Sequence, residues 1–283
     1  VNGRLSPRSF RRYGKTRFFW KETLRRIDEI GTISETDARR FEALGADPLR
    51  VRVMGNAKYD SLAARADLAL REEASERLNI PPDAEVFVAG STHDGEERVV
   101  LSVWRRLLDE YPDLFLILVP RHVERGGEVL RLLGEEGLSD FITMAEIKEG
   151  KKRKAERIIV IDVIGELFTA YSLATVVYCG GSLVPKGGQN ILEPASWGKV
   201  VFYGPSMEDF VDEKESLETV GAGLQVTGEG ELFEGIKDLM KDPCSLEKRG
   251  DAAKAVVSSN RGASRRYAGM VADALAEEGK GKL

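Results

Sequence analysis

Short apolar runs alternate with amphipathic segments along most of this chain, and a glycine or a polar cluster follows nearly every run. The runs are three to six residues long and rich in Val, Ile and Leu, which is typical of buried strands. The amphipathic segments between them are typical of helices that cover a sheet. This order predicts an α/β fold with a parallel sheet covered by helices on both faces. The predicted strands of the main sheet are 86–91, 114–119, 157–161, 175–179, 200–203 and 224–226.

The first 60 residues show the same alternation on a smaller scale. A helix predicted at 17–29 is followed by two short apolar runs, and Ser34 is the predicted N-cap of a helix between these runs. The charged, Ala-rich region 61–80 has no strand pattern, so we expect it to bridge two domains. Three parts are therefore predicted. They are the end of a second Rossmann-like domain at 1–60, a doubly wound parallel-sheet domain at 61–262, and a C-terminal helix at 263–283 that packs back toward the N-terminal domain.

Composition narrows the class of protein. Apolar residues make up 42% of the chain, which is ordinary for a soluble globular protein with a core. No run approaches the roughly 18 apolar residues of a membrane-spanning helix. The two cysteines, Cys179 and Cys244, and the two histidines, His93 and His122, lack the spacing of a disulfide framework or a zinc site. Cys179 ends an apolar run and is predicted to be a small buried hydrophobe.

The net charge of −5 is unevenly distributed. Residues 1–26 contain nine basic residues and one acidic residue, with five aromatic residues interleaved. Such a segment suits a membrane surface or an anionic, partly apolar partner. It is equally typical of a solvated helix face with a few core aromatics. The acidic remainder of the chain argues against nucleic acid as a partner.

The ends of the predicted strands carry most of the unusual chemistry. In a parallel sheet the carboxyl ends of the strands meet at one edge, where ligands bind. Polar or Gly-rich clusters follow five of the strands, which is more than scattered turns would give. These clusters are Gly90–His93, Pro120–His122, Asp162–Glu166, Gly180–Asn190 and Gly204–Pro205.

The most distinctive cluster is the Gly-rich stretch 180–194. An apolar run that ends at Cys179 leads into four glycines and then into a helix predicted to begin at Asn190. A glycine loop and a helix N-terminus suit an anion, and Glu193 on the first turn suits a sugar hydroxyl. The spacing matches neither the Rossmann nor the P-loop fingerprint. Alternatively, Asn190 is only an N-cap and Glu193 completes a capping box.

Three further positions are candidates for the same ligand. Arg121, which follows Pro120, suits bidentate binding of a phosphate, or else forms an ordinary surface salt bridge. Residues 165–167 begin a helix whose free N–H groups suit a phosphate or a base, or else form an ordinary capped start. Lys58 is either a cation that faces a cleft or a solvated lysine. No Asp-x-Asp pair stands at a strand end, so a metal-free transfer of a phosphorylated sugar fits better.

Seven segments identify a family by their order along nearly the whole chain. They are NGRLSPRSF (2–10), VMGNAKYD (53–60), AGSTHDGEE (89–97), LVPRH (118–122), IDVIGEL (161–167), GGSLVPKGGQNILEP (180–194) and NRGA (260–263). In these segments the chain strongly resembles the 3-deoxy-D-manno-octulosonic acid (Kdo) transferases of Gram-negative bacteria.

The resemblance implies a GT-B architecture with two domains. It further implies inverting transfer of Kdo from CMP-Kdo to a phosphorylated lipid A precursor, without metal or other cofactor, at the cytoplasmic face of the inner membrane. The basic segment 1–26 would then face the acceptor and the anionic membrane. Lys58 falls on a family position thought to stabilise charge in the transition state. The CMP of the donor would be held by Pro120, Arg121, Gly165, Glu166, Leu167, Asn190, Ile191, Leu192 and Glu193.

Two features depart from the family. Gln189 stands where the family usually has His, and an amide cannot transfer a proton. Family members also carry a stretch before Asn2 that holds most of the acceptor domain and the glutamate taken as general base. No residue of this chain is therefore assigned as the base, and we expect it to bind CMP but to transfer Kdo weakly or not at all. The alternatives are another GT-B enzyme that uses a UDP-sugar, or a non-catalytic nucleotide- or lipid-binding remnant.

Overall fold

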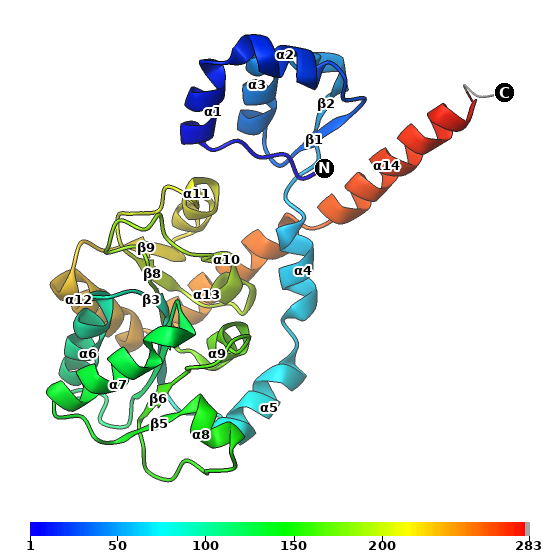
Figure 1. The fold of residues 1–283 in the computed structure, drawn as a ribbon. Helices are drawn as coiled ribbons and strands as arrows, with labels where there is room; N and C mark the ends of the chain where they lie inside the picture. Colours follow the sequence, from blue (N-terminus) through cyan, green and yellow to red (C-terminus); the bar gives the residue numbers. More distant parts are fainter. Residues whose placement is uncertain (281–283) are drawn as a thin grey trace. The chain divides into compact units, whose positions relative to one another are not determined.

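The computed structural model describes residues 1–280 and divides into two compact units (Figure 1). The first unit consists of residues 1–64 together with the C-terminal segment from Ser258, and the second unit consists of Arg65–Val257. Each unit has its own parallel sheet, and each is described by itself below.

The second unit contains a seven-stranded sheet in the order β5-β6-β4-β3-β7-β8-β9, and every neighbouring pair is parallel. In this sheet the chain begins at β3, adds β4, β5 and β6 on one side of it and β7, β8 and β9 on the other, so the topological switch point lies between β3 and β7. The predicted doubly wound parallel sheet is thereby confirmed. The strands are β3 (Val86–Thr92), β4 (Phe115–Pro120), β5 (Phe141–Thr143), β6 (Ile158–Val160), β7 (Val176–Cys179), β8 (Val201–Tyr203) and β9 (Gly223–Gln225).

The strands are apolar throughout because both faces of the sheet are covered. All seven residues of β3 are buried, as expected for the central strand of such a sheet. In Figure 1, α6, α7 and α12 lie on one face of the sheet and α5, α9 and α10 on the other. The helices of this unit are α5 (Leu68–Leu78), α6 (Glu96–Leu107), α7 (Gly126–Glu135), α8 (Met144–Lys148), α9 (Leu167–Leu173), α10 (Leu192–Ser196), α11 (Val211–Thr219), α12 (Glu229–Lys241) and most of α13 (Pro243–Ser259).

Two parts of the second unit differ from the sequence prediction. The edge strand β5 was not predicted, because three residues are too short for a clear apolar pattern. The high charge of residues 145–156 predicts an exposed loop, but this is wrong for the first part of that stretch, which α8 covers. A capping box explains this helix: Glu146 N donates to Thr143 Oγ1 at 3.1 Å, and Thr143 N donates to the Glu146 carboxylate at 2.9 Å.

The first unit has a two-stranded parallel sheet of β1 (Ile30–Thr32) and β2 (Val51–Val53). Helix α3 (Glu35–Leu44) joins the two strands, and Ser34 caps it as predicted by accepting a hydrogen bond from Asp37 N. The helix predicted at 17–29 is shorter, since α2 covers Arg17–Leu24, and α1 (Pro7–Gly14) precedes it. Leu5, Leu24, Ile30, Leu44 and Ala46 form the core.

The C-terminal helix α14 (Ala263–Lys280) completes the first unit. Tyr267 Oη donates to the carbonyls of Thr32 (3.1 Å) and Gly55 (2.8 Å), which ties α14 to the sheet. Asp60, on α4 (Lys58–Arg65), accepts from Gly262 N and from Ser264 N and so caps the start of α14. The last three residues of the predicted helix, 281–283, lie outside the described residues.

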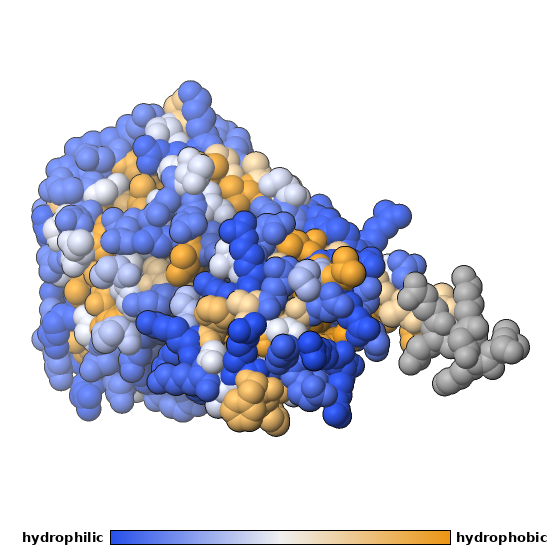
Figure 2. Space-filling model, turned by 90° about the horizontal axis from the view of Figure 1, so that it is seen from above, coloured by the Kyte–Doolittle hydropathy of each residue, from blue (hydrophilic) through white to orange (hydrophobic). Residues whose placement is uncertain are grey.

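The surface of α1 and α2 is basic and partly apolar. All nine basic residues of the segment 1–26 are exposed, and Phe18 and Phe19 are 82% and 59% exposed. Phe10 and Tyr13, in contrast, pack against the core of the first unit. Figure 2 draws hydrophobic side chains that reach the surface among hydrophilic ones. No helix within residues 1–280 is long and apolar enough to cross a membrane.

Candidate functional site

The carboxyl ends of the central strands bring three of the predicted clusters together. Arg121 N, just after β4, donates to Thr92 O at the end of β3 at 2.9 Å. Gly180 N, just after β7, donates to Gly90 O at 2.8 Å. The clusters that begin at Gly90, Pro120 and Gly180 therefore meet at the switch point, which is where doubly wound sheets bind their ligands.

A buried carboxylate that the sequence analysis did not single out organises this switch point. Glu96, the first residue of α6, is 1% exposed. Its Oε2 accepts hydrogen bonds from His93 N (2.9 Å) and Gly181 N (2.7 Å). Its Oε1 accepts from Tyr178 Oη (2.7 Å), Ser182 N and Leu183 N (both 3.0 Å). The first half of the glycine loop thus wraps around a carboxylate of the protein itself.

This arrangement corrects the sequence interpretation of the glycines. We expected the loop to come close to a ligand, but its N–H groups at 181–183 already bind Glu96. Gly180 is required because a Cβ there would lie 2.6 Å from Ser91 O. Gly187, with φ +85°, would place a Cβ 2.5 Å from the Asp209 carboxylate. The glycines therefore serve close packing within the protein.

The segment after the glycine loop is also less helical than predicted. Helix α10 begins at Leu192 and has five residues, so the dipole expected at its N-terminus is small. Asn190 Oδ1 accepts from Leu192 N at 3.2 Å, and Asn190 Nδ2 donates to Glu193 Oε1 at 3.2 Å. The capping role that the sequence left open for Asn190 is therefore present. Ile191 and Leu192 are fully buried, so only Asn190 and Glu193 offer side chains to a ligand.

Arg121 was interpreted either as a phosphate ligand or as part of an ordinary surface salt bridge. Its side chain is exposed, and within residues 1–280 its guanidinium has no ion pair or hydrogen bond. The surface salt bridge considered for it is absent from this part of the chain. Pro120 is buried as the last residue of β4 and is paired in register with Thr92. An unpaired guanidinium beside the switch point can bind a phosphate without first breaking another contact.

The segment 165–167 follows β6 and ends at the first residue of α9, at the same edge of the sheet. Gly165 is exposed with φ +93°, and the backbone N–H groups of 165–167 have no acceptor within the described residues. The Glu166 carboxylate instead forms ion pairs with Arg77 (2.6 Å) and Lys148 (2.8 Å). Burial alone would raise the pKa of Glu166, but Lys148 and Arg77 outweigh it and hold the pKa below its usual value. Only the backbone of this segment is thus available to a ligand.

Lys58 belongs to the first unit. It is the first residue of α4, it is exposed, and its backbone N–H donates to Asn56 Oδ1 at 3.0 Å. Its assigned role in charge stabilisation stays a prediction, because the other candidate residues, at the carboxyl ends of the strands, belong to the second unit.

Cys179 is inert in this setting. It is fully buried at the end of β7, and its Sγ lies 3.9 Å from Tyr171 Oη. Burial raises the pKa of the Cys179 thiol to about 12, so the thiolate is not formed near neutral pH. The prediction of a small buried hydrophobe is confirmed. No group of three or more His, Cys, Asp or Glu side chains within residues 1–280 is placed to hold a metal ion.

Glu97, the residue after Glu96, forms a buried ion pair. Glu97 is 1% exposed and accepts from Arg125 Nη1 at 2.6 Å and Nη2 at 3.3 Å. Arg125 also forms an ion pair with Glu128 (3.0 Å), so its positive charge is already paired within the protein. The sequence carries a signal for both acids, because two adjacent glutamates at a helix start are stabilised by the helix dipole. Their burial, however, follows only from the tertiary structure.

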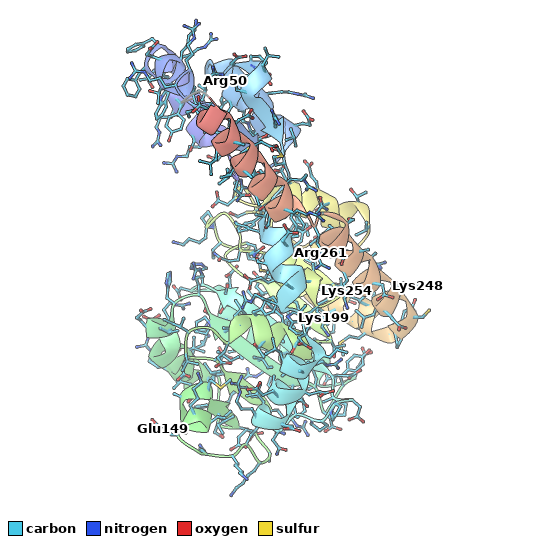
Figure 3. The ribbon with its side chains drawn as sticks, turned by 90° about the vertical axis from the view of Figure 1, so that its right-hand side faces the viewer. Arg50, Glu149, Lys199, Lys248, Lys254 and Arg261 are labelled. Carbon is cyan, nitrogen blue, oxygen red and sulfur yellow. The ribbon has the colours of Figure 1, made fainter. Side chains whose placement is uncertain are left out.

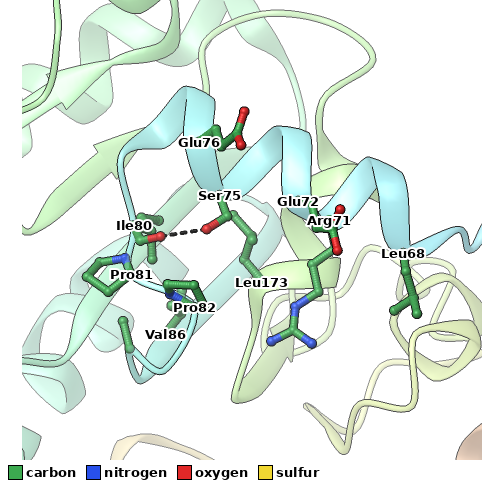
Figure 4. A pocket seen from close by; sticks show the side chains of 11 residues that line it. Leu68, Arg71, Glu72, Ser75, Glu76, Ile80, Pro81, Pro82, Val86 and Leu173 are labelled. Carbon is green, nitrogen blue, oxygen red and sulfur yellow. Dashed lines mark hydrogen bonds between the residues drawn. The ribbon is translucent and has the colours of Figure 1, made fainter.

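An apolar cavity of about 330 Å³ lies at the opposite edge of the sheet (Figure 4). It is lined by residues of α5, by the loop 80–84 and by Val86, where β3 begins. Arg71 lines it too, and the buried environment of Lys199 together with the charge of Arg71 lowers the pKa of Lys199 to about 8 (Figure 3). Because ligands of parallel sheets bind at the carboxyl ends, this cavity is not the candidate nucleotide site.

Comparison with known sequences gives one family. Residues 1–61 match the family model of 3-deoxy-D-manno-octulosonic-acid transferases. The chain is related to the Kdo transferases. It is 33% identical over 267 residues to the 3-deoxy-D-manno-octulosonic acid transferase of Haemophilus influenzae, covering 94% of this chain and 61% of that protein. It is also 34% identical over 249 residues to a bifunctional glycosyltransferase/methyltransferase of Fusobacterium nucleatum, covering 88% of this chain and 38% of that protein. The chain thus spans between about two fifths and three fifths of these relatives.

Solved structures agree with this relationship. The C-terminal CMP-Kdo binding domain of WaaA from Acinetobacter baumannii aligns with a TM-score of 0.61 and 26% identity, covering 68% of this chain and 99% of that domain. HepE of Anabaena, solved with UDP-glucose, aligns with a TM-score of 0.58 over 93% of this chain and 68% of its own, at 14% identity. The second likeness concerns the fold alone. The GT-B type of fold predicted for the chain is confirmed.

Proposed function

We propose that this chain contains the donor-binding part of a Kdo transferase, with CMP-Kdo bound at the carboxyl ends of the strands of the seven-stranded sheet. The observation that carries the proposal is Arg121, an exposed and unpaired guanidinium beside the switch point of a domain similar to a CMP-Kdo binding domain. Arg121 and Pro120 would hold the phosphate side of CMP. The free N–H groups of 165–167 and the polar side chains of Asn190 and Glu193 would hold its nucleoside.

The proposed reaction is an inverting transfer that uses no metal. The acceptor hydroxyl attacks the anomeric carbon of Kdo, the bond from that carbon to the phosphate oxygen breaks, and CMP departs with an additional negative charge. Arg121 would stabilise this charge directly, and Lys58 is proposed to assist it. A general base must take the proton of the acceptor hydroxyl, and no residue of this chain is assigned to that role.

The first unit is proposed to meet a phosphorylated lipid A precursor at an anionic membrane surface. The nine exposed basic residues of the segment 1–26 suit the phosphates of such an acceptor, and exposed Phe18 and Phe19 suit the interfacial region of a bilayer. The solvated-face interpretation accounts for Phe10 and Tyr13, which pack on the core, but leaves Phe18 and Phe19 unexplained. We propose peripheral association with the cytoplasmic face of the inner membrane.

Calorimetry with CMP and with UDP tests the donor site. We expect CMP to bind more tightly, and we expect Arg121→Ala to weaken it at least tenfold, or about 1.4 kcal/mol. Arg131→Ala, on the exposed face of α7, is the matched control and should bind as the parent does. Tighter binding of UDP would favour an enzyme that uses a UDP-sugar, and no binding of either nucleotide would refute the proposal.

A transfer assay with CMP-Kdo and a lipid A precursor tests the reaction. We expect weak turnover from this chain, and robust turnover would place the general base among its own residues. A chimera that adds the N-terminal domain of the Haemophilus influenzae relative should transfer Kdo. Nucleotide binding without turnover in that chimera would favour a non-catalytic binding protein.

Vesicle flotation tests the membrane surface. Vesicles with anionic phosphatidylglycerol should carry the chain upward in the gradient, whereas pure phosphatidylcholine vesicles should not. Phe18→Ser with Phe19→Ser should reduce the floated fraction several-fold. Leu49→Ser, which removes an 87% exposed side chain elsewhere in the first unit, is the control. Equal flotation of both variants would exclude α2 as the contact.

A further inference from the structure

The end of β3 is strained at the switch point. Ser91 has φ +54°, in the left-handed region that non-glycine residues rarely adopt, and the pairing of β3 with β4 shifts register between Gly90 and Thr92. Such strain costs on the order of 1–3 kcal/mol and is retained mainly where a function needs it. Thr92, the last residue of β3, and His93 follow Ser91 directly.

Both of these side chains have a buried polar atom without a partner. Thr92 is fully buried, and its Oγ1 makes no hydrogen bond within the described residues. His93 Nε2 is likewise buried and unpaired. A buried polar group without a partner costs about 1–3 kcal/mol, so two adjacent ones call for an explanation. A ligand that accepts hydrogen bonds from both would provide it.

Charges of both signs surround His93. Burial lowers the pKa of His93, the Glu96 carboxylate raises it, and His122, Lys186 and Arg125 lower it. The Glu96 carboxylate accepts from five donors of the protein, which disperse part of its negative charge. Lys186, in contrast, is exposed and makes no ion pair within residues 1–280.

The ring of His93 also lies against the glycine loop. A Cβ on Gly181 would be 3.3 Å from His93 Cδ2 and 3.4 Å from Gln189 Nε2, so these two side chains flank the same glycine. The rings of His93 and His122 meet edge to face with their centroids 5.9 Å apart. His93 therefore places an imidazole beside the loop on which Gln189 carries an amide that cannot titrate.

We propose that Thr92, His93 and Lys186 form an oxyanion subsite at the switch point, which holds an acidic group of the nucleotide-sugar. The inference rests on the proposed function in that its ligand is the donor. Thr92 Oγ1 and the Nε2–H of His93 donate to the anion, and Lys186 supplies the opposite charge. A phosphate and the carboxylate of the sugar acid share this chemistry, and the experiment below separates them.

The test uses the fact that the chain contains two histidines. NMR titration of the imidazoles, assigned with His122→Gln, reports the pKa of His93 alone and in the presence of inorganic phosphate, CMP or free Kdo. A bound anion stabilises the imidazolium, so the pKa of His93 should rise by about one unit. A rise with phosphate and CMP assigns the phosphate, whereas a rise only with free Kdo assigns the sugar carboxylate.

Variants give a second readout. Thr92→Val keeps the shape of the side chain and removes the hydroxyl. It should weaken the binding of whichever anion raised the pKa of His93 about tenfold. The double variant His93→Gln with Lys186→Ala should weaken it to the same extent. Lys214→Ala, on α11, is the matched control for a lost charge. A pKa of His93 that none of the three probes moves, while CMP still binds by calorimetry, overturns the subsite and leaves the proposed function standing. If CMP does not bind, the proposed function fails, and an unmoved pKa with phosphate and with Kdo then rejects the subsite as well.

Discussion

The buried carboxylate of Glu96 gives the sharpest prediction, because one atom can be replaced without changing the shape of the side chain. In Glu96→Gln the amide oxygen can take the place of Oε1 and keep the donors from Tyr178, Ser182 and Leu183. The amide NH₂ then faces His93 N and Gly181 N, which lose their acceptor. The opposite orientation leaves three donors unpaired and is worse.

The magnitude follows from these two lost acceptors. Each buried donor left without a partner costs about 1–3 kcal/mol, so the free energy of unfolding should fall by about 4 kcal/mol. Because the same carboxylate holds the loop 181–183, this loop should also become more mobile in the variant. CMP binding should therefore weaken at least tenfold under conditions where the variant is folded.

The assay is urea unfolding followed by circular dichroism, together with calorimetry of CMP binding. Glu135→Gln, which removes a charge from an exposed side chain of α7, is the matched control and should change stability by less than about 1 kcal/mol. A Glu96→Gln variant within 1 kcal/mol of the parent, with unchanged CMP affinity, would refute the reasoning that this carboxylate organises the switch point.

Three further predictions concern other parts of the second unit. Arg121→Ala should leave the urea midpoint unchanged, because the guanidinium has no partner within the described residues, so a clear loss of stability would reveal a structural role. Gly180→Ala should destabilise by about 1–3 kcal/mol, since its Cβ meets the Ser91 carbonyl, whereas Gly127→Ala, with open space around it, should not. Lys199 has a folded pKa of about 8, so between pH 8 and 10.5 the unfolded chain binds a proton that the folded chain does not, and stability rises with pH. The stability advantage of Lys199→Met should therefore shrink by about 2 kcal/mol between pH 7 and 9.5. Lys254→Met, at an exposed lysine, is measured beside it, and a difference for Lys199→Met that does not change with pH would contradict this.

Much of the fold could be predicted from local patterns. Six of the seven strands of the main sheet were predicted, because fully buried parallel strands are continuous apolar runs. Ser34 and the helix after it were also predicted, since a cap is a local signal. The edge strand β5 and the short helix α8 were not, because a three-residue strand and a five-residue helix have too few residues to show a period.

The candidate site was predicted less completely. Its expected place at the strand ends followed from the parallel topology, and the polar clusters after the strands were named in advance, but Glu96 was not. The prediction that the N–H groups of the glycine loop face a ligand was wrong for residues 181–183. Whether a loop N–H faces a ligand or a carboxylate of the protein depends on which helix start lies opposite the loop. Glu96 is 86 residues from Ser182, and no local pattern connects them.

The sequence by itself determined most of the strand and helix order, the parallel sheet, the edge at which we expect a ligand and the relationship to the Kdo transferases. These depend on periodicity, on chain chirality and on motifs that lie within a few residues of each other. The tertiary structure alone decided which polar groups are already satisfied. It pairs Glu166 with Arg77 and Lys148 and encloses Glu96 in the glycine loop. Among the described residues it leaves the Arg121 guanidinium, Thr92 Oγ1 and His93 Nε2 without hydrogen-bond partners. The reason is physical: a hydrogen bond or an ion pair depends on distances between residues far apart in the chain, and only folding sets those distances.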